Sequence, residues 1–393
     1  MVSHSQKVVV IGGNHHNTLG VIRSLGKVGI APLVILTSGD DNSFVLKSKY
    51  IQRSWVVKGS EEAIKTLLHE LASIDSKSVV IGCHDGISSA IDSNRDILLP
   101  YFEIPGTKKT GEITRLMNKK AMGELATQVG LNVPETIILN KNSFTENRNI
   151  PYPCITKPVE SKSGSKSEIV ICNTPEELAS FFNGSKYLKD YIVQRYIKKT
   201  IEFQLIGCSL DFGNEVIIPG VSVILRQTKS SNTGFLHYTQ LDGTFGQTLE
   251  NTKTFIKKVG YSGLFSVEFL RNNIGKDYFM EMNFRNDGNA IAVTNAGVNL
   301  PYIWYLYCIG ADYKNEIKTI HDEYVMPEFV ELSLFQRGII SRKEWKQDMK
   351  KATTFMDYDF EDPAPTDGWK KYNRQRLKNQ VFRFVNLIHK NNK

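Results

Sequence analysis

The sequence predicts a chain of mixed architecture: an N-terminal α/β domain, a larger α+β domain and a small C-terminal extension. Strands and helices alternate as far as residue 105, and strands with short turns dominate from residue 135 to residue 285. Beyond residue 329 the pattern becomes shorter and more charged. The 393 residues are enough for two or three domains of roughly 100 to 200 residues each. We place the domain boundaries at 1–105, 106–320 and 321–393.

Composition and charge exclude several classes of protein. Hydrophobic residues make up 41% of the chain and charged residues 23%, which is typical of a globular protein and argues against disorder. The net charge of +8 is concentrated in residues 366–393, so no nucleic-acid partner is expected. Five scattered cysteines without a CxxC pair predict free thiols in a reducing compartment. The sequence shows neither a secretory signal nor an apolar segment of ~20 residues that could cross a bilayer, so we expect a cytoplasmic protein.

The N-terminal domain is predicted to contain two strand and helix units. Residues 7–11 form a strand, the turn GGNHHNTLG leads into a helix, and residues 32–36 form the next strand. A helix at 61–72, a strand at 79–82 and a helix from residue 87 complete a pattern typical of a parallel sheet. The glycine-rich turn invites a dinucleotide-binding interpretation, but GxGxxG is absent and the second strand lacks a terminal acid to hold a ribose. A nicotinamide oxidoreductase is therefore the least favoured function, although the turn is suited to bind an anion through backbone N–H groups.

The middle domain is predicted to begin with a helix over 112–129, because apolar residues recur there at helical spacing until Gly130. Further helices are expected at 175–182, 249–259 and 301–309. The strands between them carry the residues that indicate chemistry.

The stretch GLFSVEFLRNNIGKDYFMEMNFRNDG predicts two strands joined by a turn. Because side chains alternate along a strand, Glu281, Asn283 and Arg285 are expected to share one face, with Glu268 of the preceding strand beside Glu281. The opposite, apolar face is expected to carry Tyr278, Met280, Met282 and Phe284. Two carboxylates and an amide oxygen are suited to hold Mg²⁺ together with substrate phosphates. A polar strip facing solvent would show the same periodicity.

Two segments upstream contain further polar residues on apolar strands. In YPCITKPVESKSGSKSEIVI, Lys157 ends a strand just before a loop of Ser and Gly, an arrangement suited to bind phosphate. A plain hairpin would have the same composition. In YIVQRYIKKTIEF, an apolar strand is followed by the carboxylate of Glu202.

These segments, in this order, resemble the ATP-grasp superfamily of ATP-dependent carboxylate–amine or carboxylate–thiol ligases. The superfamily includes D-alanine–D-alanine ligase, carbamoyl phosphate synthetase and biotin carboxylase. The resemblance runs from about residue 7 to residue 310 and is strongest in four blocks. It implies a Rossmann-like pre-ATP-grasp domain, followed by an ATP-grasp domain of two lobes with a hinge near 193–198.

The resemblance implies a phosphate site and an adenine site. The first nucleotide lysine matches Lys119 in RLMNKKAMGELATQVGLNVPET, with Lys120 as the neighbouring alternative, and the second matches Lys157 in ITKP. The loop that covers the phosphates corresponds to residues 160–166, with backbone donors at Ser163, Gly164 and Ser165. The adenine-reading hinge matches Gln194, Arg195, Tyr196 and Ile197, where the glutamine departs from the glutamate common in the family. Glu202 matches the ribose-binding carboxylate.

The resemblance also implies ATP and Mg²⁺, which Mn²⁺ could replace, and a mechanism. The metal ligands match Glu268, Glu281 and Asn283, and Arg285 in the ExNxR pattern acts with Lys157 on the transferring phosphoryl group. A substrate carboxylate attacks the γ-phosphate of ATP, and an amine then displaces phosphate from the acyl phosphate to leave an amide or peptide-like bond. No Ser/His/Asp or Cys/His nucleophile arrangement is recognisable in the sequence. A kinase that stops after phosphoryl transfer and a non-catalytic nucleotide-binding protein remain as alternatives.

The expected partners are a small carboxylate and a small amine. In this family the N-terminal domain helps to bind the substrate, which makes Asn14, His15, His16 and Asp85 candidates. Arg226 and Lys229 in LRQTKSSNTG could bind a second carboxylate. A surface loop would have the same composition. The N-terminal layout and the ending MNFRNDG…AGVNLP most resemble ligases of envelope or polysaccharide pathways, including D-aspartate ligase.

The C-terminal tail predicts a basic amphipathic helix. Its apolar face carries Leu377, Val381, Phe384, Val385 and Ile388. Such a helix either packs on the body of the protein or contacts an anionic membrane surface. A homodimer is also left open.

Overall fold

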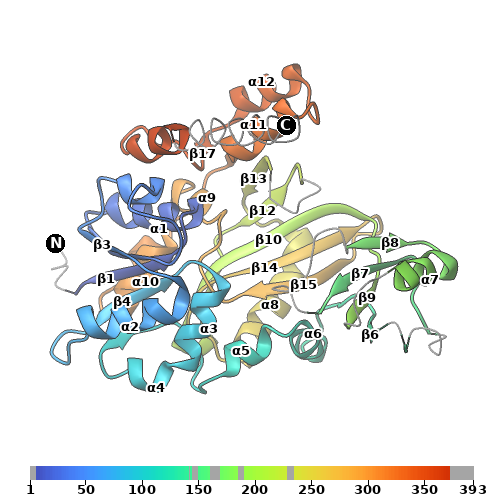
Figure 1. Cartoon of the computed structure of the whole chain (residues 1–393), viewed down its shortest axis with the longest axis horizontal. Coiled ribbons are helices and arrows are strands. Elements are labelled where there is room, and N and C mark those ends of the chain that lie inside the picture. The colour runs from blue at the N-terminus through green and yellow to red at the C-terminus, as the bar shows by residue number, and fades with distance from the viewer. Residues whose placement is uncertain are drawn as a thin grey trace, which may run out of the picture.

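The computed structural model describes residues 6–140, 142–143, 149–159, 169–184, 190–227 and 234–371. This part of the chain contains three sheets (Figure 1). In Figure 1 the N-terminal sheet lies at the left, the largest sheet in the centre and the smallest at the right. The C-terminal helices lie above the first two.

The N-terminal sheet is parallel throughout, as the alternation of strands and helices predicts, with the order β3-β2-β1-β4-β5. Its strands are β1 (Val8–Gly12), β2 (Leu33–Leu36), β3 (Arg53–Val56), β4 (Ser78–Gly82) and β5 (Phe102–Glu103). The connecting helices are α1 (His16–Gly26), α2 (Gly59–Leu71), α3 (Asp85–Ser93) and α4 (Arg95–Leu98). The strand order reverses between β1 and β4, and ligands bind outside the carboxyl ends of strands at such a point. The turns after β1 and β4 therefore mark this edge as a place for substrate.

Both faces of the N-terminal sheet are covered. Val8 and Val10 of β1 pack in one apolar cluster with α1 and with α10 (Leu300–Cys308) from much later in the chain. Val9 and Ile11 pack in another cluster with α2 and α3. Burial on both faces accounts for the continuous apolar sequence of the strand.

The central sheet is built around the long strand β10 (Lys199–Leu210), in the order β15-β14-β10-β12-β13-β16-β17, with β11 also paired to β10. The other strands are β11 (Glu215–Ile217), β12 (Val221–Ile224), β13 (Leu236–Thr239), β14 (Gly263–Asn272), β15 (Asp277–Asn283), β16 (Glu323–Met326) and β17 (Thr354–Phe355). The hairpin of β14 and β15 confirms the two strands predicted there. Helix α8 (Gly246–Val259) packs on this sheet through Phe255, Ile256 and Val259.

The smallest sheet is antiparallel and forms a separate lobe beside the central sheet (Figure 1). Its strand order is β6-β9-β7-β8. The strands are β6 (Thr136–Leu139), β7 (Cys154–Pro158), β8 (Val170–Cys172) and β9 (Tyr191–Arg195), and α7 (Pro175–Gly184) covers them with Leu178 and Phe182.

The prediction of a single continuous helix over 112–129 is wrong. The structure has two helices, α5 (Glu112–Leu116) and α6 (Lys119–Gln128), with a break at Met117 and Asn118. The Asn118 side chain accepts hydrogen bonds from the backbone N–H groups of Lys120, at 3.0 Å, and Ala121, at 3.2 Å. An asparagine at this position caps a new helix instead of continuing the old one.

The C-terminal region does not form a detached extension, because β16 and β17 belong to the central sheet. Helices α11 (Glu328–Gln336) and α12 (Arg342–Lys351) follow β16, and the short α9 (Ile291–Asn295) contacts α1. The basic helix predicted beyond residue 371 lies outside the described residues. Within the described ranges, no helix is long and apolar enough to span a membrane. All five cysteines are free, as predicted.

Candidate active site

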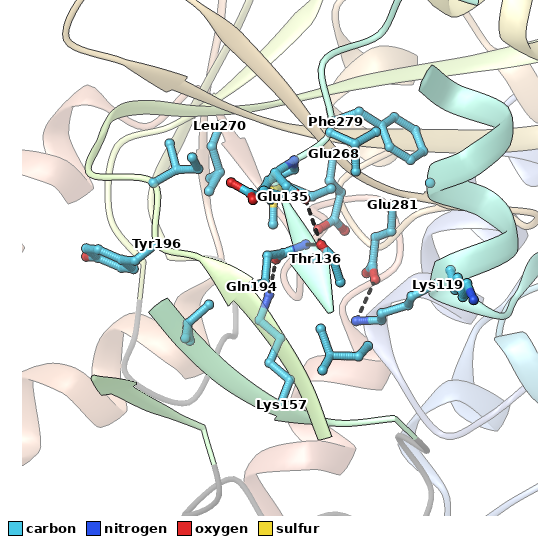
Figure 2. Close-up of a pocket in the computed structure, with 18 of the residues that line it drawn as sticks. Lys119, Glu135, Thr136, Lys157, Gln194, Tyr196, Glu268, Leu270, Phe279 and Glu281 are labelled. Atoms are coloured by element: carbon cyan, nitrogen blue, oxygen red, sulfur yellow. Dashed lines mark hydrogen bonds and ion pairs between the residues drawn. The ribbon is translucent and has the colours of Figure 1, made fainter. Parts of the chain in front are cut away.

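A cavity of about 1160 Å³ lies between the smallest sheet and the central sheet. Residues of α6, β6, β7, β9, β10, β14 and β15 line it, and Figure 2 shows their side chains pointing into one space. Its volume is somewhat above the roughly 300–1,000 Å³ that is usual for cavities that hold a small molecule or cofactor. The segments that the sequence singled out therefore meet in three dimensions.

The break between α5 and α6 places Lys119 in the first turn of α6, at the cavity. Its Nζ lies 3.2 Å from Oε2 of Glu281 on β15 (Figure 2). Lys120 also lines the cavity. Lys119 is the one of the two with an ion pair to a predicted metal ligand.

Lys157 enters the cavity from the end of β7. Its Nζ donates a hydrogen bond to Oε1 of Gln194 on the neighbouring strand β9, at 3.3 Å (Figure 2). Burial lowers the pKa of Lys157 to about 8, and the positive charge of Lys119 acts in the same direction, while Glu281 and Glu268 oppose it. A buried lysine beside a second lysine is suited to receive the negative charge of a phosphate.

Glu268 and Glu281 face each other directly across β14 and β15. The Nδ2 of Asn283 and the Nε2 of Gln204 donate to Oε1 of Glu268, at 3.2 Å and 3.4 Å. Burial raises the pKa of Glu268 well above its ordinary value, and the nearby carboxylates of Glu281 and Asp287 raise it further. Two carboxylates held this close together are suited to bind a cation, because the cation offsets the repulsion between them.

A β-bulge in this hairpin changes the predicted faces. Glu268 pairs with Glu281, but the next residue, Phe269, pairs with Phe279, so Met280 is the extra residue. Phe279, Met282 and Phe284 lie in the core, whereas Met280 lines the cavity together with Glu281. The prediction that Tyr278 and Met280 share the apolar face with Met282 is therefore wrong, because a bulge interrupts the alternation that it assumed.

The residues present fit a magnesium ion that also binds phosphates. Within the described ranges, no three His, Cys, Asp or Glu side chains gather in a ready-made metal site. Mg²⁺ commonly takes only one or two protein carboxylates and completes its shell with water and phosphate oxygens. Glu268 and Glu281 supply the two carboxylates, and the amide of Asn283 lies beside them.

The far end of the cavity is more apolar and lies at the hinge. Tyr196, Ile197 and Leu270 line the cavity there, and Figure 2 shows Tyr196 away from the lysines. Gln194 donates through Nε2 to Oγ1 of Thr136, at 2.9 Å. The side chain of Arg195 pairs with Glu135, at 2.8 Å, and is absent from the cavity lining.

Glu202, on β10, lines the cavity within a small polar cluster. Its Oε1 accepts a hydrogen bond from Nε2 of Gln227, at 2.8 Å, and its Oε2 pairs with Lys199. Lys199 also donates to Gln227. The carboxylate is thus held in a fixed orientation by two neighbours.

The side chain of Arg285, which follows β15 of the central sheet, contacts the start of α3 just after β4. Its Nε donates to Oδ1 of Asp85 at 2.7 Å, and its Nη2 donates to Oδ1 of Asn283 at 3.1 Å. Burial acts to lower the pKa of Arg285, but Asp85 and Asp287 outweigh it and raise the pKa. The guanidinium stays charged between the metal-ligand candidates and the N-terminal domain.

Two histidines lie near Arg285 at the edge where the strand order reverses. His15 caps α1 and His84 caps α3, each by accepting a backbone N–H through Nδ1. Burial lowers the pKa of both, and the charge of Arg285 also lowers it. Asn14 accepts from the backbone N–H of Val45, at 3.3 Å. Neutral imidazoles and an arginine thus surround this edge.

Comparisons with known proteins agree with this geometry. No protein-family model matches the sequence, and neither does any curated protein. Solved structures do match. The N5-carboxyaminoimidazole synthetase of Staphylococcus aureus, also solved with ADP, has a TM-score of 0.67 at 16% identity, covering 84% of this chain and 85% of that chain. The L-amino acid ligase of Bacillus licheniformis has a TM-score of 0.62 at 15% identity, covering 82% and 80%.

A third structure is the biotin carboxylase domain of 2-oxoglutarate carboxylase from Hydrogenobacter thermophilus, solved as a dimer with MgADP, ADP and bicarbonate. It has a TM-score of 0.64 at 17% identity, covering 82% of this chain and 74% of that chain. Identities this low establish the fold alone. The chain has the ATP-grasp fold.

Several of the predicted site residues lie outside the described residues or outside the cavity. Ser163, Gly164, Ser165 and Lys229 lie outside the described residues. Arg226 lies outside the cavity, and its guanidinium pairs with Glu331 and with Asp348. The guanidinium of Arg226 is therefore directed at protein carboxylates and not at the cavity.

Sequence reasoning missed several polar residues of the site, among them Thr136, Lys199, Gln204 and Gln227. Gln204 follows Glu202 by two residues on one strand, so the alternation of side chains was a signal that could have found it. Gln227 carries no such signal, because its contact with Glu202 arises only when β10 and β12 pair.

Proposed function

We propose that this protein is an ATP- and Mg²⁺-dependent ligase that activates a carboxylate as an acyl phosphate and joins it to an amine. The observation that carries the proposal is the convergence of Lys119, Lys157, Glu268 and Glu281 on one cavity of an ATP-grasp fold. Two cations for phosphate and two carboxylates for a divalent metal are the parts that phosphoryl transfer needs.

The nucleotide is proposed to lie along the cavity with its base at the hinge. Tyr196, Ile197 and Leu270 offer an apolar surface for adenine, and Gln194 offers an amide to its polar edge. Glu202 binds the ribose, and Lys119 and Lys157 bind the phosphates. The solved structures with ADP and MgADP support a nucleotide in a fold of this kind.

Glu268, Glu281 and Asn283 would hold Mg²⁺, or Mn²⁺ in its place, beside these phosphates. The metal would supply charge stabilisation to the phosphate oxygens. Arg285 adds a permanent positive charge next to Asn283. It is placed to offset the negative charge of the phosphoryl group as it moves to the substrate carboxylate.

The carboxylate substrate is proposed to bind at the edge formed by the turns after β1 and β4. Asp85 and Arg285 form one side of this edge, and Asn14 and His15 form the other. One carboxylate oxygen attacks the γ-phosphorus of ATP, and ADP leaves. The amine then attacks the carbonyl carbon of the acyl phosphate, phosphate leaves, and an amide bond remains.

The proposal is tested by nucleotide binding followed by turnover. Thermal unfolding is measured with ATP, ADP and GTP, with and without Mg²⁺; a ligand at a hundredfold excess over its dissociation constant adds about 2.7 kcal/mol of stability. Release of phosphate is then measured with pooled amino acids and sugar acids. We expect a Mg²⁺-dependent shift with adenine nucleotides, and phosphate release only when acid and amine are both present.

Two results would change the proposal. Formation of ADP that needs the acid but no amine would make the protein a kinase. No shift with any nucleotide would refute the site.

A further inference from the structure

The C-terminal helices contact the segment just after β12 through an ion cluster in which Glu331 is buried and Arg226 and Asp348 are partly buried. The guanidinium of Arg226 pairs with Glu331 of α11 through Nη1 and with Asp348 of α12 through Nη2, the latter at 2.7 Å. The Glu331 side chain is fully buried, and Oε1 also accepts the backbone N–H of Phe235 at 2.9 Å. Burial raises the pKa of Glu331, although the charge of Arg226 acts against this. The Glu331 carboxylate thus contacts the chain on both sides of the connection from β12 to β13, at Arg226 and at Phe235.

Backbone hydrogen bonds join the two chain segments beside the cluster. The backbone N–H of Arg226 donates to the carbonyl of Phe235 at 3.0 Å, and the backbone N–H of Gly234 donates to the carbonyl of Arg226 at 2.9 Å. A Cβ atom on Gly234 would lie 2.6 Å from Oε1 of Glu331 and 2.8 Å from the carbonyl oxygen of Arg226. Only glycine permits so close an approach, which indicates that the position of Arg226 is narrowly set.

The next residue, Gln227, lies on the cavity side. The two neighbouring side chains lie on different sides of the chain, since that of Arg226 pairs with Glu331 and Asp348 and that of Gln227 lines the cavity. Gln227 lines the cavity, donates to Glu202 at 2.8 Å and accepts from Lys199. A single peptide unit therefore separates the ion cluster from the contact to the carboxylate.

The C-terminal region that holds Arg226 is itself anchored on the N-terminal domain. Arg23 of α1 pairs with Asp362 at 3.2 Å, and both side chains are buried. Lys27 pairs with Asp359 at 3.0 Å, and Tyr50 donates to Glu361 at 3.1 Å. Figure 1 shows this region lying above both the N-terminal sheet and β12 and β13. The helices that pair with Arg226 thus belong to a region that is itself bound to the N-terminal domain.

We propose that Arg226 is a positioning residue for the nucleotide site: its ion pairs with Glu331 and Asp348 hold Gln227 against Glu202, so that the C-terminal helices set the affinity for the ribose. The inference rests on the proposed function, because it takes Glu202 as the ribose-binding carboxylate. It assigns the C-terminal region a part in binding that the cavity lining alone does not reveal.

The test compares two nucleotides that differ only at the ribose. Dissociation constants of Mg-ATP and Mg-2′,3′-dideoxy-ATP are measured by calorimetry for the wild type, Arg226→Met and Asp348→Asn. We expect Arg226→Met to weaken ATP binding about tenfold, the effect of losing one hydrogen bond to a charged group, with dideoxy-ATP changed less than about twofold. Asp348→Asn, which keeps the pair with Glu331, should shift ATP binding in the same direction by less, and Arg226→Lys should restore part of the affinity.

Tyr50→Phe is the matched control, because it removes a contact of the C-terminal region that does not involve Arg226. It should leave both constants unchanged. Equal weakening of both nucleotides, or unchanged ATP binding in Arg226→Met and Asp348→Asn, would overturn the inference while leaving the proposed function intact. Failure of the wild type to bind ATP would overturn both.

Discussion

Charged side chains are arranged differently in two regions of this molecule, the cavity and the anchor of the C-terminal region. In the anchor, Arg23 faces Asp362, and Arg226 faces Glu331 and Asp348. In the cavity, two lysines lie near each other and two glutamates face each other across a strand pair. In the anchor each arginine lies against carboxylates, whereas in the cavity like charges also lie near one another, although Lys119 pairs with Glu281. Like charges held this close together are suited to bind groups of the opposite sign, phosphate and a metal ion.

The pKa values of buried or partly buried cations shift in opposite directions in the two regions. In the cavity, burial lowers the pKa of Lys157 to about 8, and the like charge of Lys119 acts in the same direction. In the anchor, burial also acts to lower the pKa of Arg226, but Asp348 and Glu331 reverse the effect and raise it. Burial alone therefore does not mark a functional group. The neighbouring charge decides whether the charged form is stabilised.

The largest expected effect comes from breaking the acidic pair in the cavity. Glu281→Gln removes one proposed metal ligand, and we expect Mg²⁺-dependent turnover to fall about a thousandfold. The stability should be unchanged or higher, because Glu268 no longer faces a second carboxylate across the strand pair. Phosphate release and thermal unfolding measure the two quantities.

Glu135→Gln is the control for this variant. Glu135 also lines the cavity, but it pairs with Arg195 outside the metal-ligand group. Turnover should change less than about threefold, as for a surface ion pair. Full activity of Glu281→Gln would contradict the metal assignment.

The anchor should respond in the opposite way, with a loss of stability. Arg23→Met leaves Asp362 buried without its cation, although Ser48 still donates to it at 2.7 Å. We expect the free energy of unfolding to fall by about 3 to 5 kcal/mol. Arg53→Met, which breaks an exposed pair with Glu70, should change it by less than about 0.5 kcal/mol. Urea denaturation measures both, and a loss below about 1 kcal/mol in Arg23→Met would mean that this pair does not hold the region.

The sequence predicts the cavity better than the anchor, for a physical reason. Lys157, Glu268 and Glu281 stand out because each is a charge on an apolar strand, and the register of one hairpin brings the two glutamates together. The anchor joins Arg226 to residues more than a hundred positions away, which no local pattern indicates.

Local features also limited the prediction of the fold. The helices α2 and α8 follow from apolar spacing alone, and the structure confirms both. The break before Lys119 and the bulge at Met280 do not follow from it, because the apolar pattern continues through both positions. Each irregularity brings a side chain into the cavity, Lys119 in the first case and Met280 in the second.

The smallest expected effect is a change of ATP affinity with pH, caused by the protonation of Lys157 in the cavity. Because its pKa in the free protein is about 8, the ammonium is mostly present at pH 7 and mostly absent at pH 9. Phosphate favours the charged form, so nucleotide binding above pH 8 must be accompanied by uptake of a proton. The affinity for ATP should therefore fall about tenfold between pH 7 and pH 9. In Lys157→Arg the guanidinium stays protonated throughout, so the affinity should depend less on pH over this range, and the dependence that remains is that of Glu268, whose pKa burial raises to about 8. Calorimetry at pH 7, 8 and 9 measures both proteins, and an equal pH dependence in the two would assign the titration to a group other than Lys157.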